Sequence, residues 1–160
     1  MTIDQKHLWF VAPEIGALSE VWMYRQAAGM PKLRTEVVTL EHANAESYPA
    51  KNFSVSVVPK FSTWARVKRR LTNGTINPYL PYKGQMKWYE ALYAEKKPDV
   101  MLCQYGPTAN NMNEVARHLK IPLVVHFHGY DLSFYLKSSP SYVKELKSNC
   151  LLYTSPSPRD

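Results

Sequence analysis

The sequence predicts an α/β domain, a Rossmann-like parallel sheet with helices on both faces. Between residues 7 and 149, short apolar runs rich in β-branched residues alternate with longer stretches of helical character. The 160 residues are 45% hydrophobic and 21% charged, which suits one globular domain with a real core and hardly two. No apolar run approaches the roughly 18 residues that a membrane span needs.

The elements follow from apolar periodicity and from the residues that interrupt it. Pro13 and Gly16 close the first apolar run, Gly29 and Pro31 end the first helix, and Pro98 stops a later helix. Strands are expected at 7–12, 34–40, 54–58, 100–103 and 122–127, and helices at 18–28, 61–71, 83–95, 108–119 and 141–147.

Charge and cysteine content restrict the partners and the compartment. Twenty Lys and Arg against thirteen acidic residues give a formal charge of +7, which favours anionic partners such as phosphates, nucleic acid or acidic lipid. Two cysteines, Cys103 and Cys150, exclude a disulfide scaffold and a four-thiolate zinc module. The low cysteine count favours a reducing, cytosolic setting, and the first residues lack the features of a secretory signal. We therefore expect a cytoplasmic protein, at most peripheral on the inner face of the membrane.

The last eleven residues, 150–160, differ in character from the rest. They resemble translated adaptor or vector read-through, and the alternative is a disordered Ser/Pro-rich tail. We therefore expect the folded unit to end at residue 149 and the chain to be a fragment.

The first loop at a strand's carboxyl end contains Gly16 and Ser19. In doubly wound sheets ligands bind outside these ends, so the loops after Ala12, Cys103 and Phe127 are candidate sites. A glycine at a strand-to-helix turn suits a phosphate or sugar contact, whereas the alternative is a plain turn with Ser19 capping the helix. Neither the dinucleotide fingerprint nor the P-loop motif is present.

The loop after the last strand contains His126 and His128, which point to the same face of an extended strand. A metal site is one interpretation, but the H-x-H-x-D-H pattern fails at positions 130 and 131. In the other, His126 is structural, and His128 beside Gly129 donates a hydrogen bond to a sugar hydroxyl or phosphate. The His-Gly pair without a G-x-S-x-G motif argues against an α/β-hydrolase.

The middle loop contributes Gln104 and Tyr105, which end a strand and are expected to face a ligand. Thr108 or Asn110 is expected to cap the helix that follows.

Three segments resemble the N-terminal half of family-four glycosyltransferases of the GT-B fold: PEIGALSEVWMYRQ, PDVMLCQYGPTA and IPLVVHFHGYDLS. They lie within residues 7–133. Ser19-Glu20 matches the family's Ser-Glu-Thr, although Val21 stands where Thr is usual. His-Gly-Tyr-Asp at 128–131 matches the His-Gly-x-Asp that lines the family's cleft.

This resemblance implies retaining transfer of a sugar from a nucleotide-sugar donor to a glycan or lipid-linked acceptor in polysaccharide biosynthesis, with no further cofactor and no metal. It implies that His128 is catalytic, donating to the transferred sugar or holding the acceptor. The expected substrate-binding residues are Gly16, Ser19, Glu20, Gln104, Tyr105, Gly129 and Asp131. No second α/β unit and no Glu-x7-Glu pair follow His128, so we expect an acceptor-side half without its C-terminal domain, inactive alone because transfer needs both substrates in one closed cleft.

A basic segment supports an alternative function. Five cations and no acid lie within eleven positions from Lys60, interleaved with apolar residues at helical spacing. Such a helix either packs with a solvated outer face or lies on an anionic membrane. The candidate membrane contacts are Trp64, Arg66, Lys68, Arg69 and Arg70. No nucleic-acid motif accompanies them, so we expect no nucleic-acid partner.

Two further hypotheses therefore stand beside a glycosyltransferase. One is a non-catalytic module that associates with a membrane or binds carbohydrate. The other is a metal-dependent hydrolase built on His126 and His128.

Overall fold

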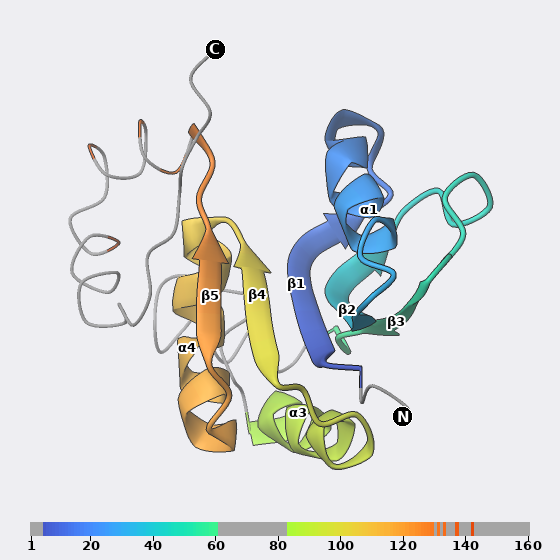
Figure 1. Cartoon of the computed structure of the whole chain (residues 1–160). Coiled ribbons are helices and arrows are strands. Elements are labelled where there is room, and N and C mark those ends of the chain that lie inside the picture. The colour runs from blue at the N-terminus through green and yellow to red at the C-terminus, as the bar shows by residue number, and fades with distance from the viewer. Residues whose placement is uncertain are drawn as a thin grey trace.

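The computed structural model describes residues 5–60 and 83–129, together with residues 131, 133, 137 and 142. Within these ranges, five parallel strands form one sheet in the order β3-β2-β1-β4-β5 (Figure 1). The strands are β1 (His7–Ile15), β2 (Arg34–His42), β3 (Phe53–Val57), β4 (Val100–Gln104) and β5 (Leu123–His126). The helices are α1 (Val21–Ala28), α3 (Lys83–Glu95) and α4 (Gly106–Leu119), with a 3-10 turn η1 (Leu18–Glu20) before α1.

This architecture confirms the predicted Rossmann-like α/β fold. Two expected helices are not tested by it. The segment at 61–71 lies outside the described residues, as does the segment at 141–147 apart from Tyr142.

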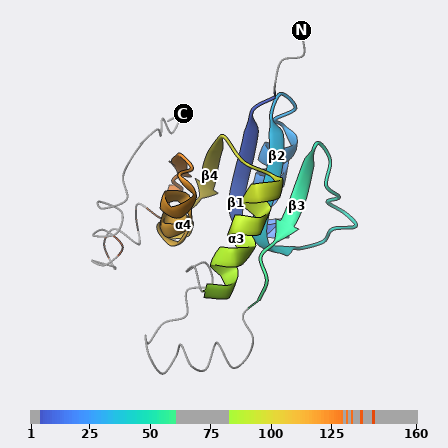
Figure 2. The same cartoon turned by 90° about the horizontal axis from the view of Figure 1, so that it is seen from below.

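Hydrophobic cores cover both faces of the sheet, because successive side chains of a strand point to opposite sides. On one face, Leu8 and Phe10 of β1 pack in a cluster with Met23 of α1. On the other face, Trp9 and Met101 pack with residues of α3 and α4. Seen from below, α3 crosses in front of β1 and β2 (Figure 2). Full burial of one such large apolar side chain contributes about 1.5 to 3 kcal/mol, so the two clusters stabilise the packing of the helices on the sheet.

β1 is longer than the sequence predicts. It continues through Pro13 to Ile15, whereas Pro13 was expected to close it. The last pair of β1 with β4 is Val11 with Cys103, so from Ala12 onward β1 pairs on one side only, with β2. Proline is tolerated where a strand has such a free edge.

α4 begins two residues earlier than predicted. Pro107 lies in its first turn, where a missing N–H costs nothing. Thr108 is buried inside the helix, and the expected caps from Thr108 and Asn110 are wrong, since an acceptor distant in sequence, Asp131, binds the first N–H. Ser19 likewise does not cap α1, which has no side-chain cap.

Candidate functional site

The carboxyl edge of the sheet gathers most of the candidate residues. β1 and β4 are neighbours, and the chain extends outward from this pair to β2 and β3 on one side and to β5 on the other. Ligands of doubly wound folds bind at such a switch point. The loops after β1, β4 and β5 meet there, at the end toward which the β4 and β5 arrows point in Figure 1.

Gln104, the last residue of β4, is the centre of a hydrogen-bonded cluster. Its side chain is fully buried, although the sequence suggests that it faces a ligand. Its Nε2 donates to Oε1 of Gln26 on α1 at 3.1 Å. Its Oε1 lies 2.9 Å from Nδ1 of His126 and 3.3 Å from Nε2 of His128. Both histidines therefore point to the same face, as their alternation predicts.

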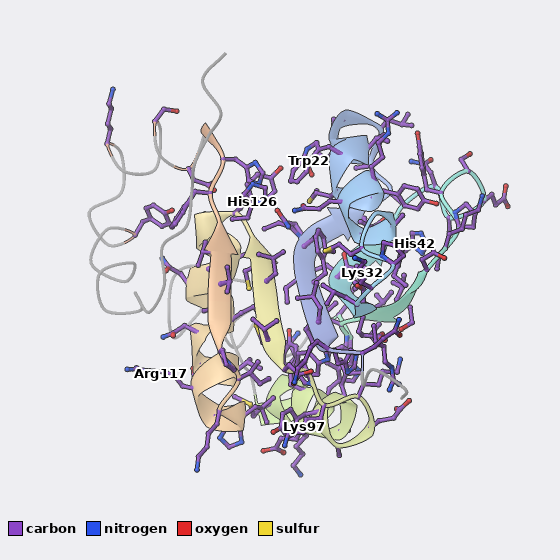
Figure 3. All side chains as sticks on the ribbon, viewed as in Figure 1. Trp22, Lys32, His42, Lys97, Arg117 and His126 are labelled. Carbon is purple, nitrogen blue, oxygen red and sulfur yellow. The ribbon has the colours of Figure 1, made fainter. Side chains whose placement is uncertain are left out.

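Aromatic rings pack against the two imidazoles. The His126 and His128 ring centroids are 4.4 Å apart, and the Tyr105 ring lies 4.5 Å from that of His128. Trp22 of α1 approaches both histidines, at 4.5 Å from His128 and 6.1 Å from His126. Figure 3 shows Trp22 and His126 reaching toward one another from α1 and β5. A half-buried imidazole beside aromatic faces offers polar and apolar contacts to one ligand.

Tyr105 occupies a backbone conformation that is unusual for a residue with a side chain. Its φ is 70° and its ψ is 141°, a region that costs a non-glycine residue roughly 1 to 3 kcal/mol. Its amide donates to the His126 carbonyl at 3.0 Å, and its hydroxyl donates to the Glu20 carboxylate. Burial, assisted by that carboxylate, raises the pKa of the Tyr105 hydroxyl well above its ordinary value. The phenol consequently stays protonated and acts as a donor to Glu20.

Asp131 links the loop that carries His128 to the start of α4. It is 1% exposed, and its Oδ2 accepts hydrogen bonds from the amides of Gly106, at 3.0 Å, and His128, at 3.2 Å. Gly106 is the first residue of α4, so the carboxylate also faces the positive end of the helix dipole. The anion-binding position at this helix N-terminus is thus filled by the protein's own carboxylate.

The two candidate glycines have different surroundings. Gly16 has φ +83°, and a Cβ there would lie 2.2 Å from the Ala43 carbonyl oxygen, so the close approach that it allows is to the chain itself. A Cβ on Gly129 would meet nothing within 4 Å. Ser19 is exposed next to Glu20 on the first loop, and Glu20 reaches the cluster through Tyr105.

The protonation of His128 is set by opposing influences. Burial lowers its pKa below the ordinary value of 6.5, and the neighbouring His126 lowers it further. The carboxylates of Asp131 and Glu20 raise it, but by less. The outcome favours the neutral ring at physiological pH.

The metal-binding interpretation of the histidine pair stays a hypothesis. Each ring turns one nitrogen to the Gln104 amide oxygen, which leaves the other ring nitrogen of each histidine for a further partner. Among the described residues, no group of three His, Cys, Asp or Glu side chains is placed to hold a metal ion.

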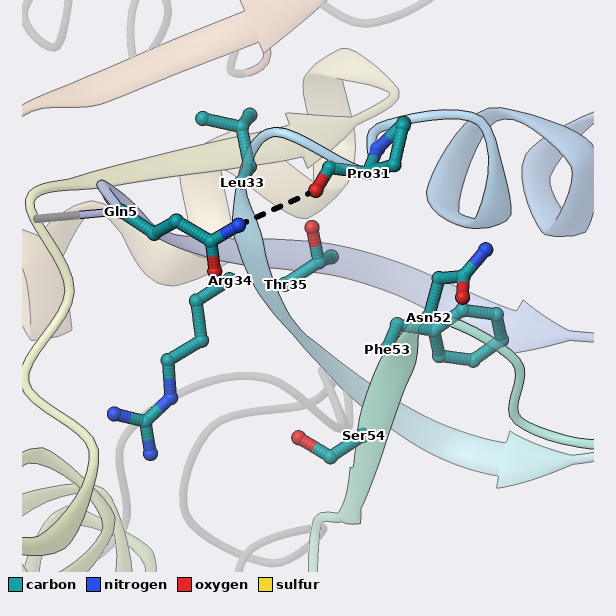
Figure 4. A pocket seen from close by; sticks show the side chains of 8 residues that line it. All are labelled: Gln5, Pro31, Leu33, Arg34, Thr35, Asn52, Phe53 and Ser54. Atoms are coloured by element: carbon teal, nitrogen blue, oxygen red, sulfur yellow. Dashed lines mark hydrogen bonds between the residues drawn. The ribbon is translucent and has the colours of Figure 1, made fainter. Parts of the chain in front are cut away.

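A pocket of about 390 Å³ lies at the opposite, amino-terminal edge of the sheet, where β2 and β3 begin (Figure 4). Among the described residues that line it, Arg34 is the one charged residue, and the others are Gln5, Pro31, Leu33, Thr35, Asn52, Phe53 and Ser54. The Gln5 amide donates to the Pro31 carbonyl across it. The pocket is separated from the histidine cluster by the length of the strands, so it takes no part in that site.

Among solved structures, the chain is similar to Phytolacca americana UGT2 in its complex with UDP-2fluoro-glucose and pterostilbene. The match has a TM-score of 0.50 and 13% sequence identity. It covers 79% of this chain and 31% of the other, so this chain spans about a third of that glycosyltransferase's length. No protein-family model matches the chain, and neither does any curated protein. The similarity shows a Rossmann-like fold of the kind found in GT-B glycosyltransferases.

Two members of the cluster were not predicted from the sequence. Trp22 and Gln26 lie four residues apart on α1, so they share the helix face that is turned to the histidines. A polar residue one turn after an aromatic one is the signal that could have identified Gln26, but it is common on surface helices. Only the packing of α1 against the β4 end distinguishes it.

The membrane hypothesis stays a prediction. Its residues, Trp64, Arg66, Lys68, Arg69 and Arg70, lie outside the described ranges. Of the helices within those ranges, none has the length and apolar character needed to span a membrane.

Proposed function

We propose that this chain is the acceptor-side part of a glycosyltransferase that moves a sugar from a nucleotide-sugar donor to a glycan or lipid-linked acceptor with retention of configuration. One observation carries the proposal. At the switch point of a GT-B-like sheet, the imidazole of His128 packs against the rings of both Trp22 and Tyr105, with the Glu20 carboxylate close by. Sugars combine apolar ring faces with hydroxyl groups, and this set of side chains matches both features.

The charges at this edge of the sheet favour binding of the acceptor over binding of the donor. The charged residues in the described cluster, Glu20 and Asp131, are both carboxylates. The first amide of α4 is already bonded to Asp131, so this helix terminus is less available to a diphosphate. A neutral, hydroxyl-bearing ligand therefore suits this edge better than the phosphates of a donor.

The proposal is tested by titrating the isotope-labelled chain with UDP-glucose and, separately, with D-glucose while recording the imidazole signals by NMR. We expect D-glucose to shift the His128 signals at millimolar concentration and UDP-glucose to shift them through its sugar. In His128→Ala the signals of the neighbouring His126 should no longer shift on addition of D-glucose. His118→Ala is the matched control, because His118 is an exposed histidine that pairs with Glu90 on the surface between α3 and α4.

Sugar transfer is the second measurement. We expect no transfer or hydrolysis of UDP-glucose by this chain alone, since transfer needs both substrates held in one closed cleft. A longer protein that contains this domain and a donor-binding domain should transfer sugar, and His128→Ala should lower its kcat. Near-normal transfer by that variant would refute the role of His128.

A carbohydrate-binding module without catalysis is the second candidate, favoured by the Trp22 ring 4.5 Å from that of His128. It predicts the same binding of D-glucose but no transfer in any longer protein that contains the domain. The membrane variant of this hypothesis predicts salt-sensitive co-sedimentation with anionic liposomes.

A further inference from the structure

A chain of three side-chain hydrogen bonds crosses the candidate site. It begins at Gln26 on α1, passes through the fully buried amide of Gln104, and ends on the two imidazoles. Gln26 Oε1 accepts from Gln104 Nε2, which turns the oxygen of Gln104 toward His126 and His128. The orientation of one buried amide is thus set from α1 and transmitted to β5 and the loop that follows it.

Hydrogen-bond accounting then determines where the ring protons lie. An amide oxygen only accepts, and it has two lone pairs, so each of the two ring nitrogens facing it must carry a hydrogen. A neutral imidazole has one N–H. His126 is therefore protonated on Nδ1 and keeps its lone pair on Nε2, whereas His128 is protonated on Nε2 and keeps its lone pair on Nδ1.

We propose that Gln104, oriented by Gln26, is a positioning residue that holds His126 and His128 in opposite tautomers, so that His128 presents an acceptor, Nδ1, to a ligand hydroxyl. The tautomer part stands on the hydrogen bonds alone, and the ligand part rests on the proposed function. The resemblance to glycosyltransferases suggests a donating His128. In this structure His128 accepts from the ligand instead, because the single N–H of its neutral ring already donates to Gln104.

The groups around His128 are consistent with a neutral ring that accepts. It is packed against Trp22 from α1 and against Tyr105 and His126. Burial and His126 together lower its pKa, and the Glu20 and Asp131 carboxylates only partly oppose them. Asp131 accepts from the backbone amide of His128 and not from its imidazole. The His128 ring can therefore turn to Gln104.

Long-range ¹H–¹⁵N spectra of the labelled 160-residue chain measure the tautomers directly. At about pH 8, above the ordinary histidine pKa of about 6.5, we expect His126 as Nδ1–H and His128 as Nε2–H. His126 is the more informative reporter, since free neutral histidine favours Nε2–H. Gln104→Leu should shift the tautomer ratio of His126 toward Nε2–H by a factor of roughly 5. This factor corresponds to the net free energy of one hydrogen bond, about 1 kcal/mol.

Further variants distinguish a role of Gln104 in positioning the imidazoles from a general loss of folding. Gln104→Glu keeps an accepting oxygen and should keep the two N–H groups that face it, but it loses the donor to Gln26 Oε1, and its carboxylate should raise the pKa of both histidines. Gln26→Leu breaks the chain at its less buried end, so it stays informative even if Gln104→Leu fails to fold. Gln85→Leu is the control, because Gln85 is a buried glutamine of α3 that donates to Pro59 away from the site. It should leave both tautomers unchanged.

Three results would overturn parts of the inference. Nε2–H on His126 with Nδ1–H on His128 would mean a reversed amide and a donating His128. Unchanged tautomers in Gln104→Leu would remove the positioning role while leaving sugar binding intact. Correct tautomers without a shift of the His128 Nδ1 signal on addition of D-glucose would remove the ligand part and, with it, support for the proposed function.

Discussion

Replacing Asp131 by alanine should destabilise the fold as well as the site. The substitution leaves the amides of Gly106 and His128 without their shared acceptor. Hydrogen bonds to a charged group contribute about 1.5 to 3 kcal/mol each, and the helix dipole adds to the first. Because the two bonds share one oxygen, we expect a loss of about 3 kcal/mol rather than twice the single value. In a domain of this size that corresponds to a Tm lower by roughly 6 to 12 °C.

Urea and thermal denaturation followed by circular dichroism measure this loss. Asp131→Asn keeps an accepting oxygen without the charge, so it should lose about 1 to 2 kcal/mol, between wild type and alanine. A loss below about 1 kcal/mol for Asp131→Ala would refute the anchoring role. It would return Asp131 to the ligand-binding role that the resemblance implies.

Three other predictions concern the same edge of the sheet. Gly16→Ala should cost roughly 2 to 4 kcal/mol, since it combines a positive φ with a backbone clash at 2.2 Å, whereas Gly129→Ala should be nearly neutral in the same urea titration. Tyr105→Phe removes the donor to Glu20 and should lower stability by about 1 kcal/mol; an unchanged unfolding midpoint would show that this bond contributes nothing. The pKa of His128 lies below 6.5, so the unfolded chain takes up the proton first. The stability that His128 contributes should therefore be complete above about pH 6.5 and should decrease as the pH falls through the folded-state pKa; an NMR titration midpoint above 6.5 would contradict this.

Much of the fold could be predicted from the sequence because it depends on local patterns. Apolar runs such as Leu123–His126 indicate buried parallel strands, and the alternation of a strand places His126 and His128 on one face. The predicted ends of the helices and strands were less accurate. Pro13 lies inside β1 because the strand has lost its β4 neighbour there, which no local pattern reveals.

The candidate site was predicted in its loops but not in its contacts. Glu20, Gln104, Tyr105 and His128 were expected at one edge, and the structure brings them together. Gln104 was expected to face a ligand and is instead buried beneath the histidines.

The sequence by itself determined the class of fold and the loops that carry polar residues, because strand periodicity and turn residues act over a few neighbours. Only the tertiary structure decided the strand order, which sets α1 beside the end of β4 and so brings Gln26 within hydrogen-bonding distance of Gln104, seventy-eight positions away. It also decided that Asp131, twenty-five positions after Gly106, binds the start of α4. Such contacts depend on how whole elements pack, and the energy that selects them is shared by both hydrophobic cores rather than encoded at either residue.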